Sequence, residues 1–272
     1  MSFSDLLTID ALKMTRNLPD ELIKAIPVLM VNRQGDTCDA YMRTENFIGH
    51  VAPEKTYQLS FSGFNEAMDQ EAKPLPTPTM PPHCVLTGVW QESVDLVIKD
   101  ANILGGNGRY TLAEGAESLV VPVAEATPTH LAYYGCHLLA VGDATSFNTQ
   151  HNLPVTITSI GKDYAEGYLQ KAEKGGGAYL EVHDRPHFHM PLEDSAGGYL
   201  IIGKQASDHT RYISAFQIPF GYAVHMPPWA IHCDGYLIGR YMVVYSATSE
   251  FSTVIVRKID STPAPITFCC ST

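Results

Sequence analysis

The histidines of this chain gather in one part of the sequence, where they could bind a metal ion. Six of the eleven histidines lie between residues 183 and 232. His187 and His189 are separated by one residue, and on a β-strand this spacing points both imidazoles to the same face. Glu193 follows four residues after His189, and His232 comes on a later segment. Three imidazoles and a carboxylate that converge inside a barrel would suit one divalent transition metal, such as Fe, Mn, Ni, Co, Cu or Zn, with open positions for substrate or water.

Other polar residues near these histidines could move protons or bind an anion. His183 and His225 are close enough in sequence to line the same cavity, and imidazole titrates near neutral pH, so both are candidates for a general acid or base. For each of them, a hydrogen bond to the backbone is the alternative. Arg240 lies in the apolar run GYLIGRYMVVYS, where a charge is costly unless it is paired, so it is the preferred anion clamp. Glu181 shares strand parity with His183 and is a further charged candidate.

The elements that must position these side chains are short strands. From about residue 81 to residue 258 the sequence consists of β-branched and aromatic runs, such as CVLTGVW and GGYLIIG, broken by Gly, Asn, Asp and Pro. No helical period separates these runs, so the pattern predicts a mainly all-β fold, an antiparallel sandwich or barrel.

The spacing of the histidines resembles the two motifs of the cupin superfamily. The centre of the first motif, two histidines one residue apart and then a glutamate, is matched by His187, His189 and Glu193, although the flanking glycines are out of register. The resemblance implies a cupin-type double-stranded β-helix, or jelly-roll barrel. It also implies that the metal ligands are His187, His189, Glu193 and His232. If Glu193 belongs instead to a polar hairpin, a three-histidine site remains.

The second cupin motif is matched by Gly221, Pro227 and His232 at the motif's spacing. Trp229 stands where the motif has a glycine, and Tyr236 stands where it has an asparagine. These departures fall on turn and spacing positions, so they affect hairpin geometry and subfamily more than the ligand set.

Composition shifts along the chain suggest four segments. Residues 1–80 form an expected N-terminal extension, with a short helix between Pro19 and Pro27 capped by Asn17, and a proline-rich connector from Lys73 to His83. Residues 81–165 contain enough β-strand patterns to form a degenerate second cupin half, although no sequence repeat is evident. Residues 166–260 would form the metal-binding barrel, and residues 261–272 a tail.

Charge and cysteine content restrict the partners. The chain has 18 Lys and Arg against 29 Asp and Glu, a formal charge of −11, which argues against nucleic acid and anionic membranes as partners. No apolar run is long enough to span a bilayer, and the first residues lack the pattern of a signal peptide. The six cysteines are scattered without a CxxC pair, so a cytoplasmic protein with reduced thiols is expected.

These observations lead to three functional hypotheses. The first is a metal-dependent enzyme that acts as a Lewis acid on a small oxygen-rich metabolite, a sugar derivative or a keto or hydroxy acid, in an isomerase, epimerase or lyase reaction. The second is an Fe(II)-dependent cupin dioxygenase with the same ligands. The third is a non-catalytic cupin that binds a metal or small molecule. The resemblance also implies a homodimer, because cupins commonly pair through sheet edges.

Overall fold

The computed structural model describes residues 18–92, 108–206, 209–245 and 247–270. Strands account for 47% of the described residues and helices for 9%, which confirms the expected mainly all-β class. The helical elements described are α2 (Asp20–Leu29), α3 (Pro128–Tyr133) and a single π-helical turn at Ala165–Leu169. The strands are β1 (Asn32–Gln34), β2 (Tyr41–Val51), β3 (Thr56–Ser60), β4 (Gly63–Glu66), β5 (Cys84–Val85), β6 (Val89–Gln91), β7 (Gly108–Thr111), β8 (Leu119–Ala124), β9 (His137–Ala140), β10 (Ala144–Ser146), β11 (Leu153–Ile160), β12 (Tyr179–His183), β13 (His187–Pro191), β14 (Gly197–Gln205), β15 (Arg211–Phe216), β16 (Tyr222–Met226), β17 (Ile231–Val244), β18 (Phe251–Arg257) and β19 (Ile266–Cys270).

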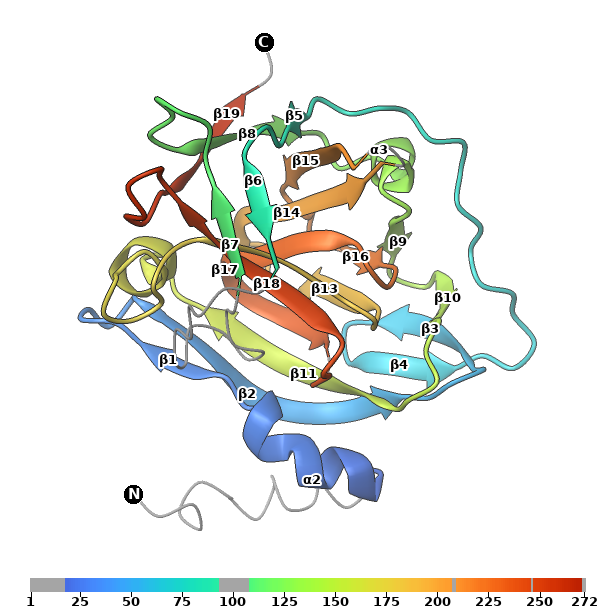
Figure 1. Ribbon diagram of the computed structural model, residues 1–272. Coiled ribbons are helices and arrows are strands. Elements are labelled where there is room, and N and C mark those ends of the chain that lie inside the picture. Colours follow the sequence, from blue (N-terminus) through green and yellow to red (C-terminus); the bar gives the residue numbers. More distant parts are fainter. Residues whose placement is uncertain (1–17, 93–107, 207–208, 246, 271–272) are drawn as a thin grey trace.

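Two mostly antiparallel sheets share the long strand β17 (Figure 1). The second half of β17 lies in a sheet with the order β1–β2–β11–β17–β13–β16–β9. The first half lies in a sheet with the order β6–β7–β18–β12–β17–β14–β15–β8–β19, in which β7–β18, β15–β8 and β8–β19 are parallel. A small third sheet has the order β10–β3–β4.

Gly239 lies where β17 passes from one sheet to the other. Ile238 pairs with Gly197 of β14, whereas Gly239 pairs with Ile160 of β11. Gly239 has a φ of 104°, and a Cβ there would lie 2.9 Å from the Cα of Ala196. Glycine is therefore required at this crossing, both for its conformation and for the close approach of the chain.

The sheets combine strands from all of the expected segments. Strand β2, from the expected N-terminal extension, pairs with β11, and β11 pairs with β17. Of the described strands between residues 84 and 160, only β6 and β7 pair with each other; the rest pair with strands of other segments. In the described residues, this region therefore builds no separate barrel of its own. The expected tail also contributes a strand, because β19 pairs with β8.

The N-terminal helix and the proline-rich connector were both anticipated. Helix α2 starts after Pro19 but continues past Pro27 to Leu29, because Met30 still donates a backbone hydrogen bond to the Ile26 carbonyl. The expected cap at Asn17 lies outside the described residues. Residues 71–81 are extended without strand pairing, as the prolines predict, and cross the surface as a long connector (Figure 1).

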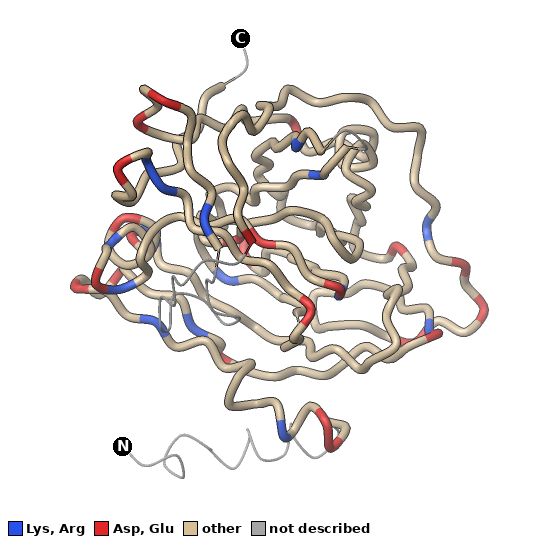
Figure 2. Tube along the Cα trace, in the orientation of Figure 1, with Lys and Arg blue, Asp and Glu red and all other residues tan. Residues whose placement is uncertain are grey.

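Charged residues of both signs are scattered over loops and strand ends, and Lys and Arg form no continuous stripe along the described chain (Figure 2). No described helix has the length and apolar character needed to cross a bilayer.

Candidate metal centre

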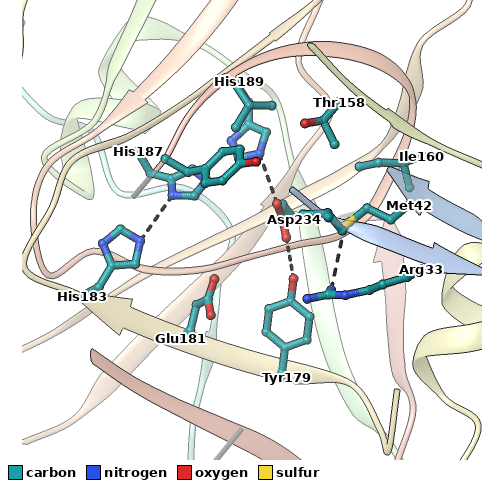
Figure 3. A pocket seen from close by; sticks show the side chains of 13 residues that line it. Arg33, Met42, Thr158, Ile160, Tyr179, Glu181, His183, His187, His189 and Asp234 are labelled. Atoms are coloured by element: carbon teal, nitrogen blue, oxygen red, sulfur yellow. Dashed lines mark hydrogen bonds and ion pairs between the residues drawn. The ribbon is translucent and has the colours of Figure 1, made fainter. Parts of the chain in front are cut away.

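A cavity of about 40 Å³ lies between the two sheets and is lined by several of the histidines singled out above (Figure 3). One sheet contributes side chains from β1, β2, β11 and β13, and the other contributes side chains from β12 and the first half of β17. The volume is enough for roughly three water molecules. The cavity can therefore hold a metal ion and a small ligand.

Three buried imidazoles from three strands converge beside this cavity. His183 lies at the end of β12, His187 at the start of β13 and His232 near the start of β17. One potential ligand atom from each lies within 4.8 Å of the other two. His183 Nε2 is 3.2 Å from His187 Nδ1, close to the about 3.4 Å that separates two ligands of a tetrahedral zinc ion with bonds of about 2.1 Å. This group could hold one metal ion.

A second group shares His187 and adds His189 and Asp234. The rings of His187 and His189 stack with their centroids 4.7 Å apart, as expected for neighbours on one face of β13. His189 Nε2 is 3.4 Å from Asp234 Oδ2, and the Tyr179 hydroxyl donates to Asp234 Oδ1. Burial alone would raise the pKa of Asp234, but the hydrogen bonds from His189 and Tyr179 outweigh it and lower that pKa. Asp234 is therefore a carboxylate at neutral pH.

The hydrogen bonds of the histidines fit a metal ion. His187 Nε2, His189 Nδ1 and His232 Nε2 are buried and have no hydrogen-bond partner among the described residues. The other nitrogen of His232 is 3.0 Å from the Ala230 carbonyl oxygen, and that of His189 faces Asp234. A ligating histidine is typically held in this way through its second nitrogen. Each unpartnered buried nitrogen costs about 1–3 kcal/mol, a cost that coordination would remove.

Burial determines the protonation of this cluster. It lowers the pKa of His183 to about 4 and that of His187 well below its ordinary value, and the positive charge of protonated His232 adds to both effects. Burial acts in the same direction on His232, but the Glu181 carboxylate, 3.4 Å away, outweighs it and raises the pKa of His232. His183 and His187 are thus neutral at pH 7 and have a lone pair available for a metal.

The structure does not bring Glu193 into either group, contrary to the expectation from the cupin motif. Strand β13 ends at Pro191, and Glu193 lies in the following turn, where its Oε1 accepts a hydrogen bond from the backbone N–H of Arg240. The carboxylate beside the histidines comes from Asp234 instead. Its spacing of two residues from His232 on a strand was a usable sequence signal, the same one that identified His187 and His189.

Arg240 is not the anion clamp of this cavity. Its side chain is 45% exposed, and its Nη2 forms an ion pair of 2.7 Å with Glu45 Oε2 on the outside of the sheet. The arginine that lines the cavity is Arg33, on the short strand β1. Sequence reasoning missed it because the polar run Asn32–Gln34 carries no motif or periodicity.

His225 lies on the opposite face of the sheet from the cavity. It pairs across the strands with Phe188, whose side chain points away from those of its neighbours His187 and His189. Its ring packs against Phe147 at a centroid distance of 4.7 Å, and burial lowers its pKa to about 3. His225 is therefore not placed to act in this cavity, whereas His183, the other expected proton carrier, is part of the cluster itself.

Comparison with protein-family models and with curated proteins finds no match for this chain.

Proposed function

We propose that the protein is a metal-dependent enzyme of the cupin type that binds one divalent transition metal between its two sheets. The observation that carries the proposal is the clustering of three buried imidazoles from three strands, those of His183, His187 and His232, whose potential ligand atoms lie within 4.8 Å of one another beside a small cavity.

The group His183, His187 and His232 is the favoured ligand set. All three side chains are buried, and the neutral forms of His183 and His187 are the forms that bind a metal. His232 must lose a proton before it can bind a metal, and the Glu181 carboxylate opposes that loss because it raises the pKa of His232. A three-histidine set leaves open positions for water or substrate and suits Zn, Co or Ni as well as Fe.

A metal bound there would act as a Lewis acid toward a substrate carbonyl or hydroxyl, which fits isomerase, epimerase or lyase chemistry on a small oxygen-rich metabolite. Glu181 lines the cavity and is placed to accept or return the proton that such a reaction moves. Its other oxygen accepts a hydrogen bond of 3.1 Å from the hydroxyl of Thr253, which fixes the carboxylate in position.

The second ligand group favours one alternative function. His187, His189 and Asp234 supply two histidines and a carboxylate, the ligand set of many non-haem Fe(II) oxygenases. A dioxygenase reaction is therefore the second candidate. The dioxygenase requires Fe(II) and Asp234 as a ligand, whereas the Lewis-acid enzyme uses three histidines and does not require iron.

Metal analysis of untagged protein tests the proposal. We expect about one metal ion per chain in the wild-type protein and in the His151→Ala variant, whose histidine is exposed and outside both groups. We expect none in His187→Ala, because both groups need His187. Full occupancy in His187→Ala would refute the site. Wild-type protein that stays metal-free after reconstitution would favour the non-catalytic hypothesis.

A further inference from the structure

Arg33 is a buried cation in the wall of the same cavity. Its side chain extends from β1 toward Tyr179 and Asp234 (Figure 3), and the residue is only 7% exposed. It is the one Lys or Arg among the described residues that line the cavity. A guanidinium in such a place is costly unless its donors are used.

The protein uses only part of the hydrogen-bonding capacity of Arg33. Its Nη1 donates to the Tyr164 hydroxyl at 3.0 Å and lies 3.9 Å from the Met42 sulfur, a weak acceptor. No described carboxylate lies within 4.0 Å of the guanidinium. A guanidinium offers five N–H donors in a planar fork that matches a carboxylate.

The carboxylates of the cavity are already engaged by other groups. Asp234 is held by His189 and Tyr179. Glu181 contacts His232 and accepts a hydrogen bond from Thr253. The positive charge of Arg33 therefore remains available to a ligand.

We propose that Arg33 binds the carboxylate of the substrate, so that the site selects small carboxylic acids with a second oxygen next to the carboxylate. This deepens the proposed function and rests on it, because the second oxygen would be the one that reaches the metal. The small volume of the cavity, about 40 Å³, favours the shortest acids of this class. A 2-oxo or 2-hydroxy acid combines the required size, charge and adjacent oxygen.

Calorimetric titration with pyruvate and with its neutral analogue pyruvamide tests this assignment. Metal-reconstituted wild-type protein should bind pyruvate at least about 10-fold more tightly than pyruvamide. The Arg33→Met variant should lose about 10- to 100-fold in affinity for pyruvate while its affinity for pyruvamide and its metal content stay unchanged. The Arg33→Lys variant keeps the charge but loses the planar fork, so its affinity should be intermediate.

Arg43→Met is the matched control. Arg43 lies on β2 one residue from Met42, is exposed, and stacks on the Tyr41 ring outside the cavity. The Arg43→Met variant should bind pyruvate and pyruvamide as tightly as the wild type does. Unchanged pyruvate affinity in a folded Arg33→Met variant would overturn the proposal and leave Arg33 the role of bracing Tyr164.

The same titrations separate this proposal from the proposed function. Equal affinity for pyruvate and pyruvamide in metal-loaded wild-type protein would refute carboxylate selection while the metal site stands. Wild-type protein that binds no metal but still prefers pyruvate, through Arg33, would refute the metal site alone. Should Arg33→Met fail to fold, the Arg33→Lys variant takes its place. An unchanged ratio of the two affinities in that variant, together with unchanged pyruvate affinity, would overturn the role of the guanidinium.

Discussion

Glu181 and His232 lie directly opposite each other where β12 pairs with β17, with Glu181 Oε1 3.4 Å from His232 Nε2. The carboxylate favours the protonated imidazole, and a proton on Nε2 blocks that nitrogen as a ligand. A metal ion at the proposed site would therefore compete with a proton for His232, and Glu181 would favour the proton.

The first prediction concerns this competition. As the pH falls through the raised pKa of His232, metal affinity should fall, because protonated His232 cannot coordinate. Glu181→Gln removes the charge that raises this pKa, so the pH at which metal is lost should move downward. Zinc binding measured by competition with a chelator between pH 5 and pH 8 checks the shift. An unchanged pH profile would mean that His232 is not a ligand.

The second prediction distinguishes the two ligand groups. If His183, His187 and His232 hold the metal, His183→Ala should lose most of the bound metal and Asp234→Asn should retain it. If His187, His189 and Asp234 hold it, the two variants should behave in the opposite way. Metal stoichiometry by elemental analysis, with iron and zinc each supplied in turn, decides between them.

The third prediction concerns His225 and acid stability. The unfolded chain protonates this histidine near pH 6.5, but the folded protein does so only near pH 3, so the unfolded state binds more protons between these values. Stability should therefore fall as the pH drops below about 6.5. At pH 4.5 the contribution of His225 amounts to about 3 kcal/mol.

The His225→Gln variant has no titrating group at this position, so its stability should depend less on pH by that amount. Urea unfolding of metal-free protein at pH 7 and pH 4.5 measures the difference. Equal pH dependence in the two proteins would show that His225 is already protonated in the folded protein at pH 4.5.

The fourth prediction concerns the crossing at Gly239. A Cβ at this position would lie 2.9 Å from the Cα of Ala196. The backbone there also has a φ of 104°, which residues with a side chain rarely adopt. Gly239→Ala should lower the free energy of unfolding by about 1–3 kcal/mol or more. Gly115→Ala is the control, because its φ of 81° carries strain but open space surrounds its Cβ position. A smaller loss in Gly239→Ala than in Gly115→Ala would contradict the steric argument.

The sequence was sufficient for the fold class and for the core of the histidine cluster. Alternation along a strand is a local rule, so the shared face of His187 and His189 followed directly from their spacing. The same rule applied to His232 and Asp234 would have found the carboxylate. Glu193 was misassigned because a motif spacing does not reveal that the strand ends at Pro191.

The remaining site residues depend on contacts between distant segments. That His225 shares a face with Phe188 follows from the register of β13 and β16, which no local pattern specifies. Arg33 reaches the cavity because β1 pairs with β2, and β2 pairs with β11. An isolated arginine in a short polar run gives no sign of such a position.

Arg33 and the proposed metal ligands come from different parts of the chain. The histidines belong to strands β12, β13 and β17, whereas β1 pairs with β2 and precedes His183 by about 150 residues. If Arg33 selects the substrate as proposed, substitutions in the β1–β2 hairpin would change which molecules bind without altering the proposed metal ligands. Such a layout would let the choice of substrate evolve separately from the chemistry of the proposed metal site.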